Sequence, residues 1–291
     1  MTLPRPRYLF VIAVACLAIV VAGVAPLVLG GSSAKDRIAS DPEPTLFPDA
    51  TVARVDALVE PESARSAALM QQWWKAHGSS TDDAAFEAWV AQVFPAPPAD
   101  RQKEIAEVER LDRSRTPRGV AAASWLEVHG KKDVWKLLVH DQAEWLPAKQ
   151  GEDRKAAEKA ALKIAKTLAD SLGAHFGVPA PYVLEPALRP DHKIVPGQTC
   201  PCSYPSRHAS AAAASRTLLA YLQPHALGQL RWWEDEIDYS RLYMAGHVSS
   251  DLEGGALLGD LVGDYILVTR LGVPVADLRP GAGPAAGAPG A

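Results

Sequence analysis

Apolar residues recur at spacings of three and four along most of this chain, and this period constrains its fold more than any other feature. The pattern predicts helices over 51–76, 81–93, 98–111, 120–140, 150–176, 207–222, 224–244 and 248–271. Proline or glycine lies at or near most of the junctions between these segments, where helices end most easily. Almost no segment alternates as a half-buried strand does, so we expect an all-α fold around one core.

The composition is typical of a globular protein and argues against some classes of binding partner. Of the 291 residues, 48% are hydrophobic, which is enough to fill a sizeable core. Lys and Arg number 30 against 34 Asp and Glu, a formal net charge of -4. A mildly acidic chain has no overall electrostatic attraction for nucleic acid or another polyanion. We therefore expect no nucleic-acid partner, and three cysteines are too few for a disulfide framework.

The N-terminus has the layout of an export signal. Residues 8–31 contain no charged side chain, and Arg5 and Arg7 precede them. This run of 24 residues is longer than a usual signal core and long enough to span a bilayer. Residues 1–34 are therefore predicted to be either an uncleaved anchor or a signal peptide cleaved near Ser32. Both alternatives place the remaining chain in the periplasm or elsewhere outside the cytoplasm, with membrane contact through 8–31 if the segment is retained.

The exported part divides into four sections. Proline-containing residues 35–50 are expected to be a linker, and residues 280–291, rich in Pro, Gly and Ala, a disordered tail. Between them, 51–119 forms an N-terminal helical region that either caps a pocket or provides an interface. Residues 120–272 hold the helices around the polar patterns described below.

Some conspicuous residues are assigned structural roles. Trp73 and Trp74 are interpreted as helix packing. Cys200 and Cys202 are interpreted as a turn with two thiols or as a local staple, since one intervening residue does not make a redox pair. A lysine series in 150–176 is assigned to a solvated helix face without function. Its members are Lys155, Lys159, Lys163 and Lys166.

A histidine and a carboxylate near residue 250 form the core of a candidate site. Ser240 and Arg241 are followed after five residues by His247 and after three more by Asp251. Residues four apart project from one face of a helix, so Asp251 is expected beside His247. A carboxylate in that place fixes the imidazole tautomer and makes the other ring nitrogen a better nucleophile.

Two shorter patterns upstream complete an anion site. Arg189-Pro190 comes first, and Pro205-Ser206-Arg207-His208 then leads into an alanine-rich helix. Ser206 is expected at the start of that helix, where backbone N–H groups favour an anion. The forked donors of Arg189 and Arg241 suit a tetrahedral oxyanion. The sum is a site for one small anion with two histidines in different environments.

In these three patterns the chain resembles the type 2 phosphatidic acid phosphatase (PAP2) superfamily, which includes the class A bacterial acid phosphatases and the vanadium haloperoxidases. The family signature is Lys, six residues, Arg-Pro; then Pro-Ser-Gly-His; then Ser-Arg, five residues, His, three residues, Asp. The third part matches fully at Ser240, Arg241, His247 and Asp251. The second matches at Pro205, Ser206 and His208, and the first keeps only Arg189 and Pro190. The resemblance is closest to the class A phosphatases and implies that 120–272 is a phosphatase domain with the helical bundle of that family.

Two positions depart from the signature. Tyr182 occupies the place of the phosphate-binding Lys, and Arg207 occupies the place of the Gly. We favour Arg207 as compensation for the missing Lys, because it preserves the positive count. Lys193 is a second candidate for that compensation, and Tyr182 retains one neutral hydroxyl donor.

The resemblance implies a phosphohistidine mechanism that requires no metal or other cofactor. His247 would attack phosphorus, Asp251 would orient it, and His208 would protonate the leaving oxygen. Arg189, Arg241 and the backbone at Ser206 and Arg207 would hold the phosphate oxygens. We expect an extracytoplasmic acid phosphatase acting on phosphomonoesters. The alternatives are a lipid phosphate phosphatase at the membrane face, a haloperoxidase with vanadate as its cofactor, and a non-catalytic phosphate-binding relic.

Overall fold

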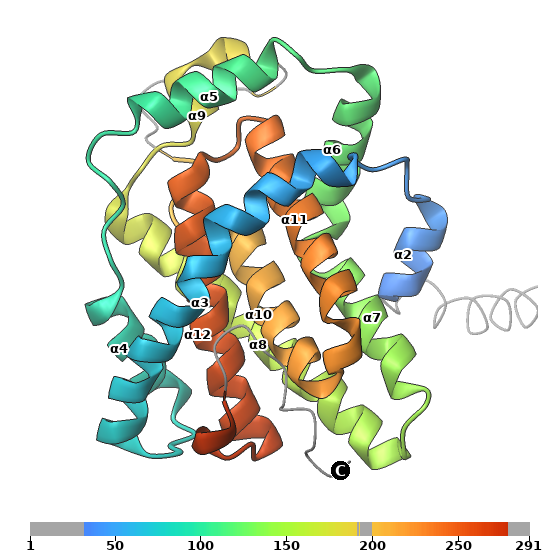
Figure 1. The fold of residues 1–291 in the computed structure, drawn as a ribbon, viewed down its shortest axis with the longest axis vertical. Coiled ribbons are helices and arrows are strands. Elements are labelled where there is room, and N and C mark those ends of the chain that lie inside the picture. Colours follow the sequence, from blue (N-terminus) through green and yellow to red (C-terminus); the bar gives the residue numbers. More distant parts are fainter. Residues whose placement is uncertain (1–31, 191, 193–199, 279–291) are drawn as a thin grey trace, which may run out of the picture.

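The computed structural model describes residues 32–190, 192 and 200–278, and it is built from helices (Figure 1). Apart from one isolated bridge between Pro179 and Cys202, all regular structure in these residues is helical, which confirms the all-α prediction. The α-helices are α2 (Ala34–Ser40), α3 (Asp49–His77), α4 (Asp83–Val93), α5 (Gln102–Asp112), α6 (Pro117–His129), α7 (Asp133–Ala143), α8 (Ala148–Phe176), α9 (Pro181–Leu184), α10 (Arg207–Leu222), α11 (Leu227–Tyr243) and α12 (Ser249–Leu271). Short 3₁₀ turns lie at Pro186–Leu188, Pro224–Ala226 and Val275–Asp277.

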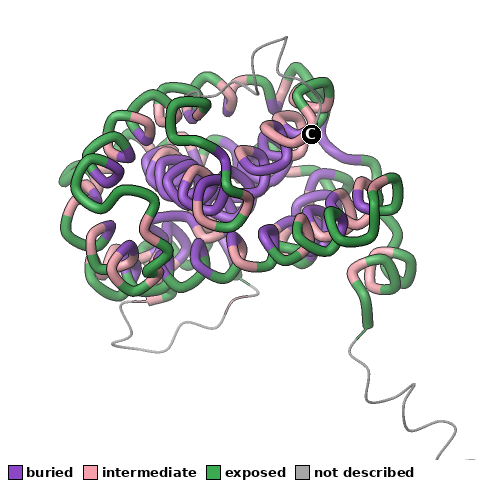
Figure 2. The backbone as a smooth tube through the Cα atoms, turned by 90° about the horizontal axis from the view of Figure 1, so that it is seen from below, coloured by how far each residue is buried: buried purple, intermediate pink, exposed green. Residues whose placement is uncertain are grey.

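Helices α10 and α12 form the buried centre, and the remaining helices surround them (Figures 1 and 2). Glycines spaced by four on α12 allow this close contact. A Cβ at Gly255 would lie 2.5 Å from the Cβ of Ala209, and one at Gly259 would lie 2.5 Å from that of Ala213. Because the contacts advance by four residues on both helices, α10 and α12 run parallel. Their N-terminal ends, which carry the second and third polar patterns, therefore lie side by side.

The predicted helix 120–140 is two helices in the structure. Helix α6 ends at His129, and α7 begins at Asp133. Gly130 lies where a Cβ would be 2.9 Å from the Ile237 side chain of α11, so only a glycine permits this close approach. The break places Lys131 and Lys132 in the connection between the two helices.

Residues 35–50, expected to be a linker, are packed onto the domain. Helix α2 begins with a capping box between Ser33 and Asp36 and contacts α7. Leu46 and Phe47 are buried, and the Phe47 ring packs edge-on against Tyr239 at 4.7 Å. The linker prediction depended on the prolines in this segment. The segment is instead held to the domain by two buried apolar side chains and by a capped helix.

The N-terminal helical region 51–119 packs against the same core. Helix α3 lies along α12 and α11. Trp73 and Trp74 are buried on α3, and the Trp73 ring packs against Phe86 of α4 and Tyr265 of α12. The packing role predicted for this aromatic pair is confirmed. Within 32–190, 192 and 200–278, no helix has the length and apolarity that a membrane crossing requires. The predicted segment 8–31, Lys193 and the tail 280–291 lie outside the described residues.

Candidate active site

His247 lies in the short connection between α11 and α12, two residues before α12 begins. The backbone N–H of His247 donates to the Arg241 carbonyl at 3.3 Å, which holds this loop against the end of α11. On the ring, Nδ1 lies 2.9 Å from the carbonyl oxygen of Ser203. A carbonyl only accepts hydrogen bonds, so Nδ1 carries the proton. In the neutral ring, Nε2 then holds the lone pair that a nucleophile needs.

Asp251 is buried in the first turn of α12 behind His247. The nearest approach of its carboxylate to Nδ1 of His247 is 3.7 Å, an electrostatic contact rather than a hydrogen bond. Its Oδ2 accepts the Val248 backbone N–H at 2.9 Å, and its Oδ1 accepts from Arg101 Nη2 at 2.5 Å. Burial alone would raise the pKa of Asp251, but the His247 imidazole and the Arg101 guanidinium outweigh burial and hold it below its ordinary value. Asp251 is therefore ionised where positive charge on His247 would develop. The expectation that both side chains share one helix face changes, because His247 precedes the helix.

The segment from Cys200 to Ser206 aligns the second pattern with the third. Cys200 and Cys202 form a disulfide, in agreement with the local-staple alternative. The segment pairs with 178–180 through the bond from Ser203 N–H to the Val178 carbonyl at 2.8 Å. At its end, the Ser206 backbone N–H donates to the Asp251 carbonyl at 2.9 Å. This bond ties the start of α10 to the start of α12.

Ser206 caps α10, as predicted, and its Oγ accepts the Ala209 N–H at 3.3 Å. His208 lies in the first turn, is 8% exposed, and has Nε2 3.0 Å from the Glu127 carbonyl oxygen. By the same argument as for His247, Nε2 of His208 donates this bond. Burial, followed by the positive charge of Arg241, lowers the pKa of His208 well below its ordinary value. The two histidines therefore differ, as the sequence predicted: one is backed by a carboxylate and the other is buried among cations.

Arg189 and Arg241 converge on the Glu127 carboxylate, which sequence reasoning did not identify. Arg189 Nη2 donates to Glu127 Oε2 at 3.3 Å, and Arg241 Nη1 lies 3.7 Å from the same oxygen. Both guanidinium groups are buried, whereas the Glu127 side chain is 36% exposed. Burial raises the pKa of Glu127, but Arg241 and Arg189 outweigh it and lower the pKa below its ordinary value. The structure thus brings the two predicted anion-binding arginines together around an anionic group.

The two departures from the signature have different surroundings. The ring of Tyr182 is buried under the Arg189 guanidinium at 5.5 Å, a cation–π contact that supports the arginine. Arg207 points to α8, where its Nη1 contacts Asp170 at 3.2 Å, and its side chain is 40% exposed. Its pairing with Asp170 gives little support to the proposed compensation. Lys193, the other candidate, is outside the described residues.

Lys131 provides a cation that the predicted unbroken helix concealed. With Glu127 and Arg189 it lines a cavity of about 560 Å³ between α2, α6 and the start of α7. Burial, followed by the charge of Arg207, lowers the pKa of Lys131; Glu127 opposes this shift, and Lys132 and Arg241 add smaller effects that lower the pKa further. A lysine surrounded by other cations beside a candidate anion site is a place where a further anion is stabilised.

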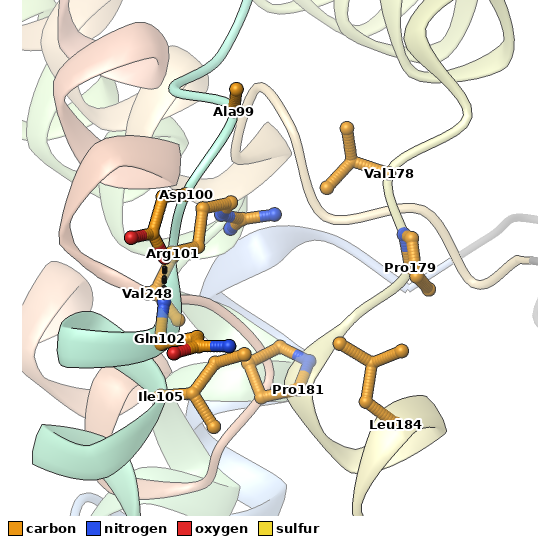
Figure 3. A pocket seen from close by; sticks show the side chains of 10 residues that line it. All are labelled: Ala99, Asp100, Arg101, Gln102, Ile105, Val178, Pro179, Pro181, Leu184 and Val248. Carbon is orange, nitrogen blue, oxygen red and sulfur yellow. Dashed lines mark hydrogen bonds between the residues drawn. The ribbon is translucent and has the colours of Figure 1, made fainter.

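A second pocket, of about 440 Å³, is lined by Arg101 and by Val248, the residue after His247 (Figure 3). Its walls come from the start of α5, the 178–181 segment and Val248, and most of its side chains are apolar. Arg101 lines this pocket and also binds Asp251, and neither His247 nor His208 is among the residues that line it. We therefore do not assign this pocket to the phosphate.

A group that offers metal ligands lies elsewhere in the described chain. His140, Asp141 and Glu144 place one ligand atom each within 4.8 Å of one another at the end of α7. All three lie at the surface, and this group includes no residue of the candidate site. Exposed acidic groups of this kind are common without a metal, and we assign it no role.

No protein-family model matches this chain, and a search of curated proteins finds no relative.

Proposed function

We propose that this protein is a phosphatase that hydrolyses phosphomonoesters through a covalent phosphohistidine, with His247 as the nucleophile. One observation carries the proposal: Nδ1 of His247 is committed to the Ser203 carbonyl beside the buried, ionised Asp251. The lone pair is thereby fixed on Nε2, and imidazolium charge formed in the attack is stabilised by the carboxylate.

The surrounding charges suit phosphoryl transfer. Arg189 and Arg241 lie around one anionic group, Glu127, and a phosphate bound there would replace or share these contacts. Lys131 supplies the positive charge that the resemblance assigns to a lysine at the place of Tyr182. In this proposal the three cations hold the phosphoryl oxygens while charge moves from the nucleophile to the leaving group.

His208 provides the proton for the leaving oxygen. It must be protonated to act as an acid, and because its pKa is lowered, the protonated form is scarce at neutral pH and becomes abundant only in more acidic solution. This direction favours activity at acidic pH. After transfer, neutral His208 accepts a proton from the water that attacks the phosphohistidine, so the same residue serves both half-reactions.

The decisive experiment follows phosphate release from p-nitrophenyl phosphate by the full-length protein in a metal chelator. His247→Ala should abolish turnover and the acid-labile phosphoenzyme formed from labelled substrate. His225→Ala, an exposed histidine outside the site, is the matched control and should retain both. Wild-type turnover in His247→Ala would refute the assignment of the nucleophile.

The same protein separates the alternative activities. Release of phosphate from a dispersed lipid phosphate, but not from p-nitrophenyl phosphate, would favour the lipid substrate. Halide oxidation only with vanadate and peroxide would favour the peroxidase. Phosphate binding without either reaction would identify the site as non-catalytic.

A further inference from the structure

Seven of the nine residues that line a groove of about 420 Å³ beside the candidate site are Lys or Arg, and their aliphatic stems form much of its wall. It lies between the α6–α7 connection, α7, α8 and the start of α10, with Leu162 and Ala211 as its apolar members. The cationic residues are Lys131, Lys132, Lys136, Lys159, Lys163, Lys166 and Arg207. Three of the four α8 lysines that the sequence pattern assigned to a solvated face thus lie opposite lysines of α7 and of the connection before it.

Five of the seven cations form no ion pair within the described residues, although acids farther away, such as Glu127 near Lys131, still act on them. Lys166 and Arg207 share Asp170, at 2.7 Å and 3.2 Å. For the other five lysines, no carboxylate oxygen of the described chain lies within ion-pair distance. Elsewhere on α8 the lysines are paired, as in Lys149 with Asp153 at 2.8 Å. The seven cations outnumber the acid paired with them in the groove and repel one another, so the groove is a place where a multivalent anion is stabilised.

The groove is continuous with the candidate site. Lys131 and Lys132 line both the groove and the 560 Å³ cavity that contains Glu127 and Arg189. Arg207, at the far wall, directly precedes His208 on α10. A ligand with its terminal phosphate at the site therefore has its remaining negative charges directed along the groove.

We propose that this groove binds the anionic remainder of an extended, multiply phosphorylated substrate whose terminal phosphate enters the candidate site. The inference rests on the proposed phosphatase function and specifies its substrate class. The shape favours a chain-like ligand over a membrane, since the cations line a concave groove rather than a flat face. Nucleic acid is disfavoured because no aromatic side chain lines the groove to stack on bases.

The test measures binding of linear inorganic polyphosphate to full-length protein carrying His247→Ala, which prevents turnover. In this background, Lys159→Gln/Lys163→Gln removes two groove charges, and Lys149→Gln/Lys155→Gln removes two charges from α8 outside the groove. The groove variant should bind polyphosphate about two- to thirtyfold more weakly, as expected for two exposed charge contacts. Its slope of log affinity against log salt should fall by about 1.4, if polyphosphate releases counter-ions as single-stranded nucleic acid does. The control variant should leave both quantities unchanged.

With an intact His247, the groove variant should have the wild-type kcat/KM for p-nitrophenyl phosphate. Its kcat/KM for tripolyphosphate should be lower than that of wild type. Equal losses in the groove and control variants, or no loss in either, would overturn the proposal. Selective loss of binding to vesicles of anionic lipid, with polyphosphate binding intact, would assign the groove to a membrane surface and also overturn it. If groove-dependent polyphosphate binding persists in a protein that hydrolyses no phosphoester, the groove is supported and the phosphatase function fails alone.

Discussion

Replacing Glu127 by Gln should make the candidate site bind inorganic phosphate and vanadate more tightly. The Glu127 carboxylate contacts both Arg189 and Arg241, so an incoming anion has to compete with it for the same guanidinium groups. Glutamine keeps the size and an acceptor oxygen but removes the charge. Competition then falls, and both arginines lose a counter-ion that only a bound anion restores.

The magnitude follows from Coulomb's law. Two unit charges about 4 Å apart interact by roughly 4 kcal/mol at an effective dielectric constant of about 20. The Glu127 side chain is 36% exposed, so solvent screens it and allows it to swing aside. We expect about a third to a half of that energy, or roughly 1.4 to 2 kcal/mol. This corresponds to inhibition constants for phosphate and vanadate about ten- to thirtyfold lower.

The assay combines inhibition of turnover with thermal unfolding. Without phosphate, the Glu127→Gln protein should unfold at a lower temperature than wild type, because Arg189 and Arg241 are buried without a counter-ion. Saturating phosphate should raise its Tm more than that of wild type, since stabilisation grows with the ratio of ligand to Kd. Glu107→Gln, at an exposed ion pair with Arg110, is the matched control. Weaker or unchanged phosphate affinity in Glu127→Gln would refute the competition argument.

Three further predictions address the acid, the carboxylate and the core. In His208→Asn, kcat/KM for alkyl phosphates, whose leaving groups are poor, should no longer rise toward acidic pH, and kcat/KM for aryl phosphates should fall less. Equal losses for both kinds of substrate would contradict the acid role. Arg101→Gln should lower kcat about tenfold with little change in KM, because Asp251 loses the partner at 2.5 Å, and the exposed-site variant Arg65→Gln should not. Burial raises the pKa of Glu158 to about 7, so the folded state holds a proton that the unfolded state releases near pH 4.5. The free energy of unfolding should therefore fall as pH rises from 4.5 to 7, by about 3 kcal/mol for this group. Urea titrations should show Glu158→Gln flattening that dependence, and an unchanged slope would contradict it.

The helices were predictable because their period and their breaks are local properties. Helix α8 was predicted over 150–176 and runs from Ala148 to Phe176, and α10 begins and ends at the predicted residues. The errors came from tertiary contacts. Between α6 and α7, Gly130 keeps helical backbone angles and Lys132 leaves them, and Gly130 is packed against Ile237, more than a hundred residues away. The packing of α2 and Phe47 depends on partners in α7 and α11.

The site was predictable where motif spacing fixes neighbours and unpredictable where separate helices meet. The spacing placed Asp251 near His247, and the cap at Ser206 followed from residue type. Arg101, which pairs with Asp251, comes from a helix 150 residues earlier and belongs to no motif. For Lys131, the available signal was Gly130 in an otherwise continuous helical pattern, which marked a break but did not say what the exposed turn would face.

The groove shows how a chain with a negative net charge can concentrate positive charge in one place. A net charge of -4 describes an average over the chain, whereas a ligand responds to charges within about one Debye length. On α8 alone, lysines beside glutamates look like an ordinary solvated face. Glu158 is instead buried in the core, where the Ser215 hydroxyl donates to its carboxylate at 2.7 Å. Lys159 and Lys163, by contrast, line the groove. Packing α7 against α8 then sets Lys132 and Lys136 along the same groove. A mildly acidic chain thus carries a concentrated cationic groove, because burial removes the compensating acid from the surface and leaves the lysines there.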